Sequence, residues 1–118
     1  MLMDAKEHFS KLLRPLFPKD ASFNHDPRFT GGLLYRVDWR IPEEGRPNKH
    51  SRPIEVVVSD ALVDDHYDAP MHVRAVMEQR IVKWINAQIA QFDPRHQYRP
   101  EQVVPAVRWI VSTAMVNP

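Results

Sequence analysis

The chain has 118 residues, a hydrophobic fraction of 43%, a charged fraction of 26% and a formal net charge of +1. These values predict one globular domain, residues 1–118, and exclude a disordered chain. The absence of cysteine excludes disulfides, thiolate metal sites and cysteine nucleophiles. The near-neutral charge gives no global reason to expect a nucleic-acid or membrane partner, and no signal peptide or membrane-spanning run stands out. We therefore expect a soluble, cytoplasmic protein.

A first helix is predicted from Asp4 to about Arg14. Asp4 can accept hydrogen bonds from the first amides, and Glu7 follows it at capping-box spacing. The apolar side chains that follow recur at helical intervals and form one stripe. Pro15 disfavours the helical conformation of the residue before it, so we expect the helix to end there.

Residues 15–32 are predicted to be irregular because proline and glycine recur through them. An alternative concerns the pair Gly31-Gly32, which would close a tight hairpin. In that case Phe29-Thr30 forms a short extra strand.

The stretch Leu33–Ile41 alternates apolar and charged residues and predicts the central strand. Its phase points the aromatic rings of Tyr35 and Trp39 into the core and leaves Arg36 and Arg40 on the outer face. A slip of one residue would exchange the two faces and expose the aromatic rings.

A second strand is predicted over Ile54–Asp60, where alternation returns. The intervening segment, Pro42–Arg52, is too polar and too rich in proline for regular structure. We therefore expect an antiparallel hairpin with a long exposed tip.

The segment Asp60–Asp68 is predicted to be an acidic joint before the main helix. Asp68 is placed as the cap of that helix and Pro70 in its first turn, with the end near Phe92. The apolar positions of the main helix cover well over half of its circumference, more than a helix lying on one sheet needs. Either the first helix or a second copy of the protein covers the remainder, and we favour the first helix.

The C-terminal residues 104–115 fit a helical and a strand pattern equally well. Pro105 would break a helix that began before it, and the residues that follow are rich in β-formers. We therefore predict a strand over Ala106–Thr113.

These elements predict an α+β fold with the order α-β-β-α-β. Because the main helix carries the chain back along the sheet, the last strand lies beside the first and antiparallel to it. The expected architecture is a three-stranded antiparallel sheet of order 2-1-3, with both helices packed on one face.

Acidic and histidine side chains gather near the start of the main helix, and an alternative interpretation assigns them to a metal or to proton transfer. The residues in question are His66, His72, Asp64, Asp65 and Asp68, beside Asp60. They show no established metal-ligand spacing, and acids are common where helices begin. We therefore assign no metal ligand, catalytic residue or cofactor.

Basic side chains lie on the outer strand face and at the hairpin tip, which raises nucleic-acid binding as a third interpretation. They are Arg36, Arg40, Arg46, Lys49, His50 and Arg52. Known sheet readers stack bases on exposed aromatic rings, whereas the predicted phase buries these rings. Pairing between arginine and Glu55 across the strands explains the outer face equally well, so nucleic acid is disfavoured.

Apolar side chains also fall on the outer face, among arginines. The surface predicted for partner binding consists of Leu34, Arg36, Arg40, Val57, Arg108 and Ile110. Apolar centres enriched in arginine are typical of protein interfaces. We therefore expect a non-enzymatic protein-interaction module that binds a protein partner or forms a homodimer.

The run Ile-Glu-Val-Val-Val-Ser-Asp-Ala-Leu at 54–62, the long helix rich in arginine and glutamine, and the closing Arg-Trp-Ile-Val-Ser-Thr at 108–113 carry a family resemblance. In these segments the chain resembles small proteobacterial families of unknown function. The resemblance implies a bacterial protein but no particular activity or site residue.

Overall fold

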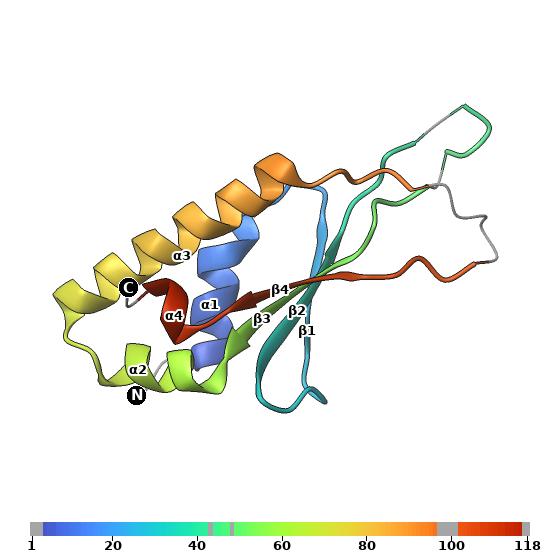
Figure 1. Cartoon of the computed structure of the whole chain (residues 1–118). Helices are drawn as coiled ribbons and strands as arrows, with labels where there is room; N and C mark the ends of the chain where they lie inside the picture. The colour runs from blue at the N-terminus through green and yellow to red at the C-terminus, as the bar shows by residue number, and fades with distance from the viewer. Residues whose placement is uncertain (1–3, 43, 48, 97–101, 117–118) are drawn as a thin grey trace.

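The computed structural model describes residues 4–42, 44–47, 49–96 and 102–116, and it shows an α+β fold in two layers (Figure 1). The elements in chain order are α1 (Ala5–Leu13), a 3₁₀ turn (Arg14–Leu16), β1 (Ser22–Asp26), β2 (Gly32–Asp38), β3 (Ile54–Ser59), α2 (Asp60–Asp68), α3 (Met71–Gln91), β4 (Val107–Val111) and α4 (Thr113–Val116). The helices lie on one face of the sheet, as predicted.

The sheet has four strands in the order β1-β2-β3-β4, so the predicted three-stranded sheet of order 2-1-3 is wrong. β1 pairs antiparallel with β2 and occupies the edge that the last strand was expected to fill. Since β1 and β2 are joined by only a short connection, their pairing is local. β4 therefore takes the free edge of β3 and pairs with it in parallel, which makes the sheet mixed.

The extra strand precedes the segment where the sequence suggested one. β1 covers Ser22–Asp26, whereas Phe29 and Thr30 lie outside the strands. Phe23 and His25 point to the inner face of β1, opposite Val37 and Tyr35 on β2. Two inward side chains in five residues are too short an alternation to mark a strand.

The inner face of the sheet carries the predicted apolar set. Tyr35, Val37, Ile54, Val56, Val58, Trp109 and Val111 are all buried. The inward phase of the central strand is therefore confirmed, although β2 ends at Asp38 and Trp39 is only partly buried. The hydroxyl of Tyr35 donates to the carbonyl oxygen of Lys6 at 2.6 Å and so ties the sheet to α1. Burial raises the pKa of this phenol.

The predicted acidic joint is in fact a helix, α2. Ser59 is its N-cap, and the Ser59 side-chain oxygen accepts a hydrogen bond from the Leu62 amide at 3.2 Å. The prediction that Asp68 caps the main helix is also wrong, because α3 has Pro70 at its N-cap position and no side-chain cap. The serine cap and the burial of Leu62 and His66 anchor this otherwise polar helix.

The C-terminal strand is confirmed over Val107–Val111, and the chain then turns into α4 from Thr113. α4 packs against α3, with Met115 against the core. The predicted strand is therefore too long at this end.

Candidate functional site

One row of side chains crosses all four strands on the outer face of the sheet. The register places Asn24 opposite Arg36, Arg36 opposite Glu55, and Glu55 opposite Arg108. Each oxygen of the Glu55 carboxylate faces one arginine: Arg36 Nη2 lies 3.3 Å from Oε2, and Arg108 Nη2 lies 3.2 Å from Oε1. The predicted pairing of arginine with glutamate across the strands is confirmed.

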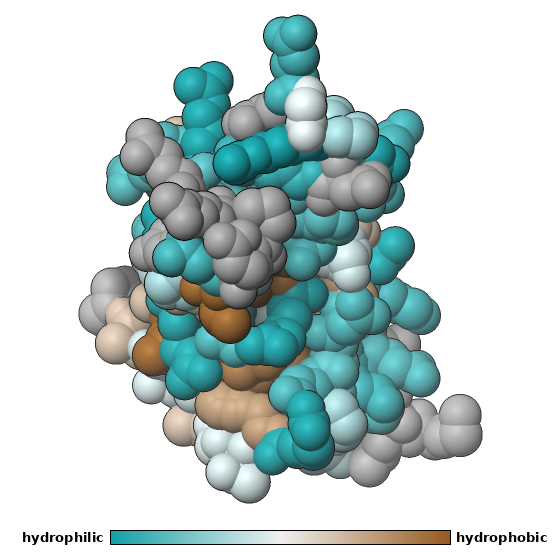
Figure 2. Space-filling view, turned by 90° about the vertical axis from the view of Figure 1, so that its right-hand side faces the viewer, coloured by the Kyte–Doolittle hydropathy of each residue, from teal (hydrophilic) through white to brown (hydrophobic). Residues whose placement is uncertain are grey.

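The next row contains the predicted apolar centre. Leu34 lies opposite Val57, and Val57 lies opposite Ile110, so the structure brings the three together. Leu34 and Val57 are nevertheless buried. The Phe29 ring extends across this face, since its centroid lies 5.5 Å from the guanidinium carbon of Arg108 on the far strand. Ile110, 51% exposed, remains as the accessible part of this row. Figure 2 shows one face of the molecule, on which hydrophobic residues form a small area among hydrophilic ones.

Arg40 lies beyond the end of β2, away from this row. It forms an isolated bridge with His50, and its Nη2 donates to the Pro47 carbonyl oxygen at 2.8 Å. Lys49 Nζ donates to the carbonyl oxygen of His96 at 2.9 Å. The hairpin tip is thus bound to the chain that follows α3, and the two project together from the sheet (Figure 1).

The acidic and histidine residues predicted around α2 do not converge. The carboxylates of Asp64, Asp65 and Asp68 are exposed, as is His72 on the first turn of α3. His66 is buried, one turn after Leu62 on the inward side of α2. Within the described parts of the chain, one group of histidine and acidic side chains is close enough to hold a metal ion, and of the predicted residues only His66 belongs to it.

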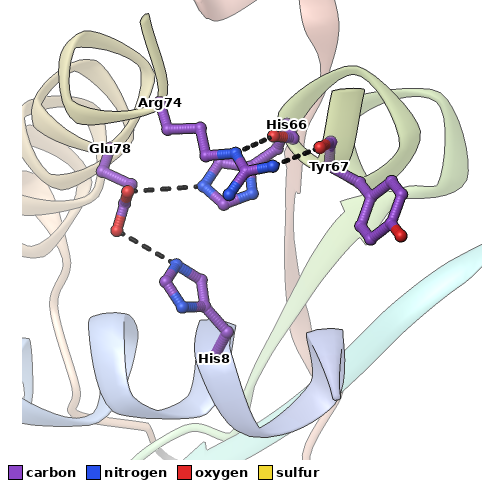
Figure 3. Close-up of polar contacts among 5 residues, drawn as sticks. All are labelled: His8, His66, Tyr67, Arg74 and Glu78. Carbon is purple, nitrogen blue, oxygen red and sulfur yellow. Dashed lines mark hydrogen bonds and ion pairs between the residues drawn. The ribbon is translucent and has the colours of Figure 1, made fainter. Parts of the chain in front are cut away.

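That group, the His–Glu–His cluster, consists of His8, His66 and Glu78 (Figure 3). Its three side chains come from α1, α2 and α3. His8 Nε2 lies 3.1 Å from Glu78 Oε1, and His66 Nε2 lies 3.3 Å from Glu78 Oε2. One carboxylate thus bridges two imidazoles that belong to different helices.

Packing and hydrogen bonds hold the rings in place. The His66 ring centroid lies 5.1 Å from that of Phe9 and 5.0 Å from that of His8. Arg74 Nε donates to the His66 carbonyl oxygen at 2.8 Å, and Arg74 Nη2 donates to the carbonyl oxygen of Tyr67. The end of α2 is therefore tied to the start of α3, which orients His66 toward Glu78.

Two of the three residues in the His–Glu–His cluster, His8 and Glu78, were not singled out in the sequence. Each directly adjoins a buried residue, Phe9 and Met77 respectively, and so lies at the border of an apolar stripe. A polar side chain at such a border is a usable signal. No periodic pattern links positions 8, 66 and 78, however, because the cluster exists only when three helices pack together.

Exposed apolar side chains concentrate where α2 meets α3. Six large hydrophobic side chains are exposed in the described chain, and four of them fall between positions 67 and 76, at the end of α2 and the start of α3; we call Tyr67, Met71, Val73 and Val76 the corner patch. Met71 is 85% exposed and Val76 is 44% exposed. The first helix was expected to cover the apolar positions of the main helix that the sheet leaves over, and at these first turns it does not. Deeper along α3, Met77, Ile81 and Ile85 are buried.

Comparisons with protein families, with characterised proteins and with solved structures found no match to this chain. Among the described residues, no helix is both long enough and apolar enough to cross a membrane.

Proposed function

We propose that this protein is a protein-interaction module that pairs with a second copy of itself through the corner patch. The observation that carries the proposal is the pair of exposed side chains Val73 and Val76, which are neighbours on one side of α3, with exposed Tyr67 and Met71 close to them in the chain. Scattered exposed hydrophobic residues are ordinary, whereas a group of them on one surface is typical of an interface. Tyrosine and methionine are also enriched at interfaces.

The charges beside the corner patch favour a second copy as the partner. Exposed acidic side chains lie on α2, and exposed basic ones lie further along α3; they are Asp60, Asp64, Asp65 and Asp68, and Arg80 and Lys83. A two-fold axis through the patch places α2 of one copy beside α3 of the other. Opposite charges then face each other, and the symmetry closes the assembly at two chains.

Sedimentation equilibrium of the full chain over a range of concentrations tests the proposal. We expect a monomer–dimer equilibrium that Val76→Glu shifts strongly toward monomer, since an apolar contact cannot hold an unpaired carboxylate. Glutamate is a good helix former, so circular dichroism should show an intact fold. A monomeric wild-type protein at the highest concentration overturns the proposal.

Ile110→Glu is the matched control, because Ile110 is an exposed apolar residue on the side of the sheet that faces away from the helices. Self-association through the corner patch leaves this variant dimeric. If Ile110→Glu dissociates the dimer and Val76→Glu does not, the outer sheet face is the interface and the corner patch is not.

A further inference from the structure

We propose that the His–Glu–His cluster is a binding site for a divalent transition metal, with Zn²⁺ as the best-matched ion. The three ligand atoms, two imidazole nitrogens and one carboxylate oxygen, all lie within 4.8 Å of one another. This inference is independent of self-association, because the cluster lies between helices of one chain.

The donor atoms and their spacing suit zinc. Two histidines and a glutamate are an established zinc ligand set, with metal–ligand distances of about 2.0–2.2 Å. Ligands at that distance on a tetrahedral ion are about 3.4 Å apart. His8 Nε2 lies 3.1 Å from Glu78 Oε1 and His66 Nε2 lies 3.3 Å from Glu78 Oε2, so each imidazole is near this distance from a different oxygen of the same carboxylate. Because the three ligand atoms lie within 4.8 Å of one another, one ion placed between them can be reached by all three side chains.

The surroundings provide both rigidity and access. All three ligands stand on helices, and the His66 ring is held by packing and by the Arg74 link to α2. The side chains of His8, His66 and Glu78 are 33%, 10% and 26% exposed, so the site is open on one side. An open side supplies the fourth ligand as water, the arrangement found in catalytic rather than structural zinc sites.

The positive charge of Arg74, one turn before Glu78 on α3, opposes cation binding. Its Nε and Nη2 groups, however, donate to the carbonyl oxygens of His66 and Tyr67 rather than to the carboxylate. Glu78 is thus left to the two imidazoles. We expect zinc to bind more weakly here than at a closed four-cysteine site. Where an imidazole nitrogen that binds zinc carries a proton, zinc takes the place of that proton.

The test is isothermal titration calorimetry, in which zinc chloride is added to the full chain after treatment with a chelator. We expect one ion per chain, and at least tenfold weaker binding in His8→Gln and in Glu78→Gln, because losing even a group that only hydrogen-bonds to a metal ligand costs about 10–100-fold. His72→Gln is the matched control, since His72 is exposed and outside the cluster. It should bind zinc as the wild type does. Absence of stoichiometric binding, or equal binding in all variants, overturns the proposal.

Nitrogen NMR of the wild-type imidazoles decides the question even if a variant fails to fold. Zinc should shift the Nε2 signals of His8 and His66 strongly and leave those of His72 in place. Unmoved signals at His8 and His66 mean that the cluster is only a hydrogen-bonded link between helices. Shifts at His72 alone place the ion at the start of α3 and equally refute the proposed site.

Discussion

Two carboxylates in this protein each bridge two basic side chains, one on the sheet and one among the helices. Glu55 lies between Arg36 and Arg108, with separations of 3.3 and 3.2 Å. Glu78 lies between two histidines, with separations of 3.1 and 3.3 Å. In both, each carboxylate oxygen faces one nitrogen, so the geometry of the two clusters is nearly the same.

The chemistry of the partners separates them. Arginine is permanently charged and has no lone pair for a metal, so the Glu55 cluster can only neutralise charge. Imidazole can be neutral, and its free nitrogen is a metal ligand. The surroundings differ too: Arg36 and Arg108 are exposed, whereas His66 is buried. The same arrangement is therefore an ion pair between strands in one layer and a candidate metal centre in the other.

The largest expected difference is the response to removing the carboxylate of Glu78. Glu78→Ala leaves the buried ring of His66 without its acceptor, which should lower the free energy of unfolding by about 2 kcal/mol. Urea denaturation measures the loss. Glu78→Gln keeps an acceptor oxygen and should recover part of it. If Glu78→Ala lowers the free energy of unfolding no more than the corresponding variant of the sheet cluster, Glu55→Ala, the two clusters contribute equally to stability.

A second difference lies in what supports each cluster. His66 stands on the short helix α2, whose N-cap is Ser59, while Glu55 stands on a strand paired on both sides. Ser59→Ala should cost about 1 kcal/mol and should loosen α2 in particular. Hydrogen exchange should quicken at amides of α2 and remain slow at those of β3. Uniform quickening over both elements would contradict this assignment.

Removing the Glu55 carboxylate should lower the free energy of unfolding by less than either change above. In Glu55→Ala the guanidinium groups of Arg36 and Arg108 stay in contact with water, so we expect a loss of about 0.5 kcal/mol. The loss should shrink further in high salt, which screens exposed charges. Glu55→Gln is the matched variant, and it should fall between the wild type and the alanine variant. A salt-independent loss would indicate that packing, not charge, explains the effect.

The smallest effect is expected at Asp26, a partly exposed carboxylate whose hydrogen bonds come from Arg28. The Arg28 backbone N–H donates to Asp26 Oδ1 at 2.9 Å, and this hydrogen bond lowers the pKa of the carboxyl below its ordinary value of 3.8. Because the folded-state pKa lies below the unfolded one, the stabilisation is present above the unfolded value and lost as pH falls through the folded value.

Urea denaturation at a series of acidic pH values measures this contribution. Asp26→Asn should unfold with a slightly shallower dependence on pH below about pH 4, where the unfolded-state carboxyl takes up its proton. An unchanged acid dependence would show that the Arg28 contact does not persist in solution.

Much of the fold was predictable because neighbouring residues decide it. Alternation placed β2 and β3 nearly at their observed positions, while Pro105 and the β-formers after it decided for β4. The Asp4 cap placed α1, since the Asp4 side chain accepts from the Lys6 amide. The pairing of Glu55 with arginine was also predictable, because strand register aligns side chains across a sheet. The five-residue β1 and the polar helix α2 were missed, because their inward side chains are too few to form a pattern.

The sequence by itself determined the phase of the central strand, which places Tyr35 in the core and Arg36 on the outer face. Strand side chains alternate strictly, so one apolar set is enough to define both faces. Only the tertiary structure decided that β1 displaces β4 from β2, and that His8, His66 and Glu78 meet. Strand order and helix packing depend on contacts between residues far apart in the chain, and no local periodicity records them.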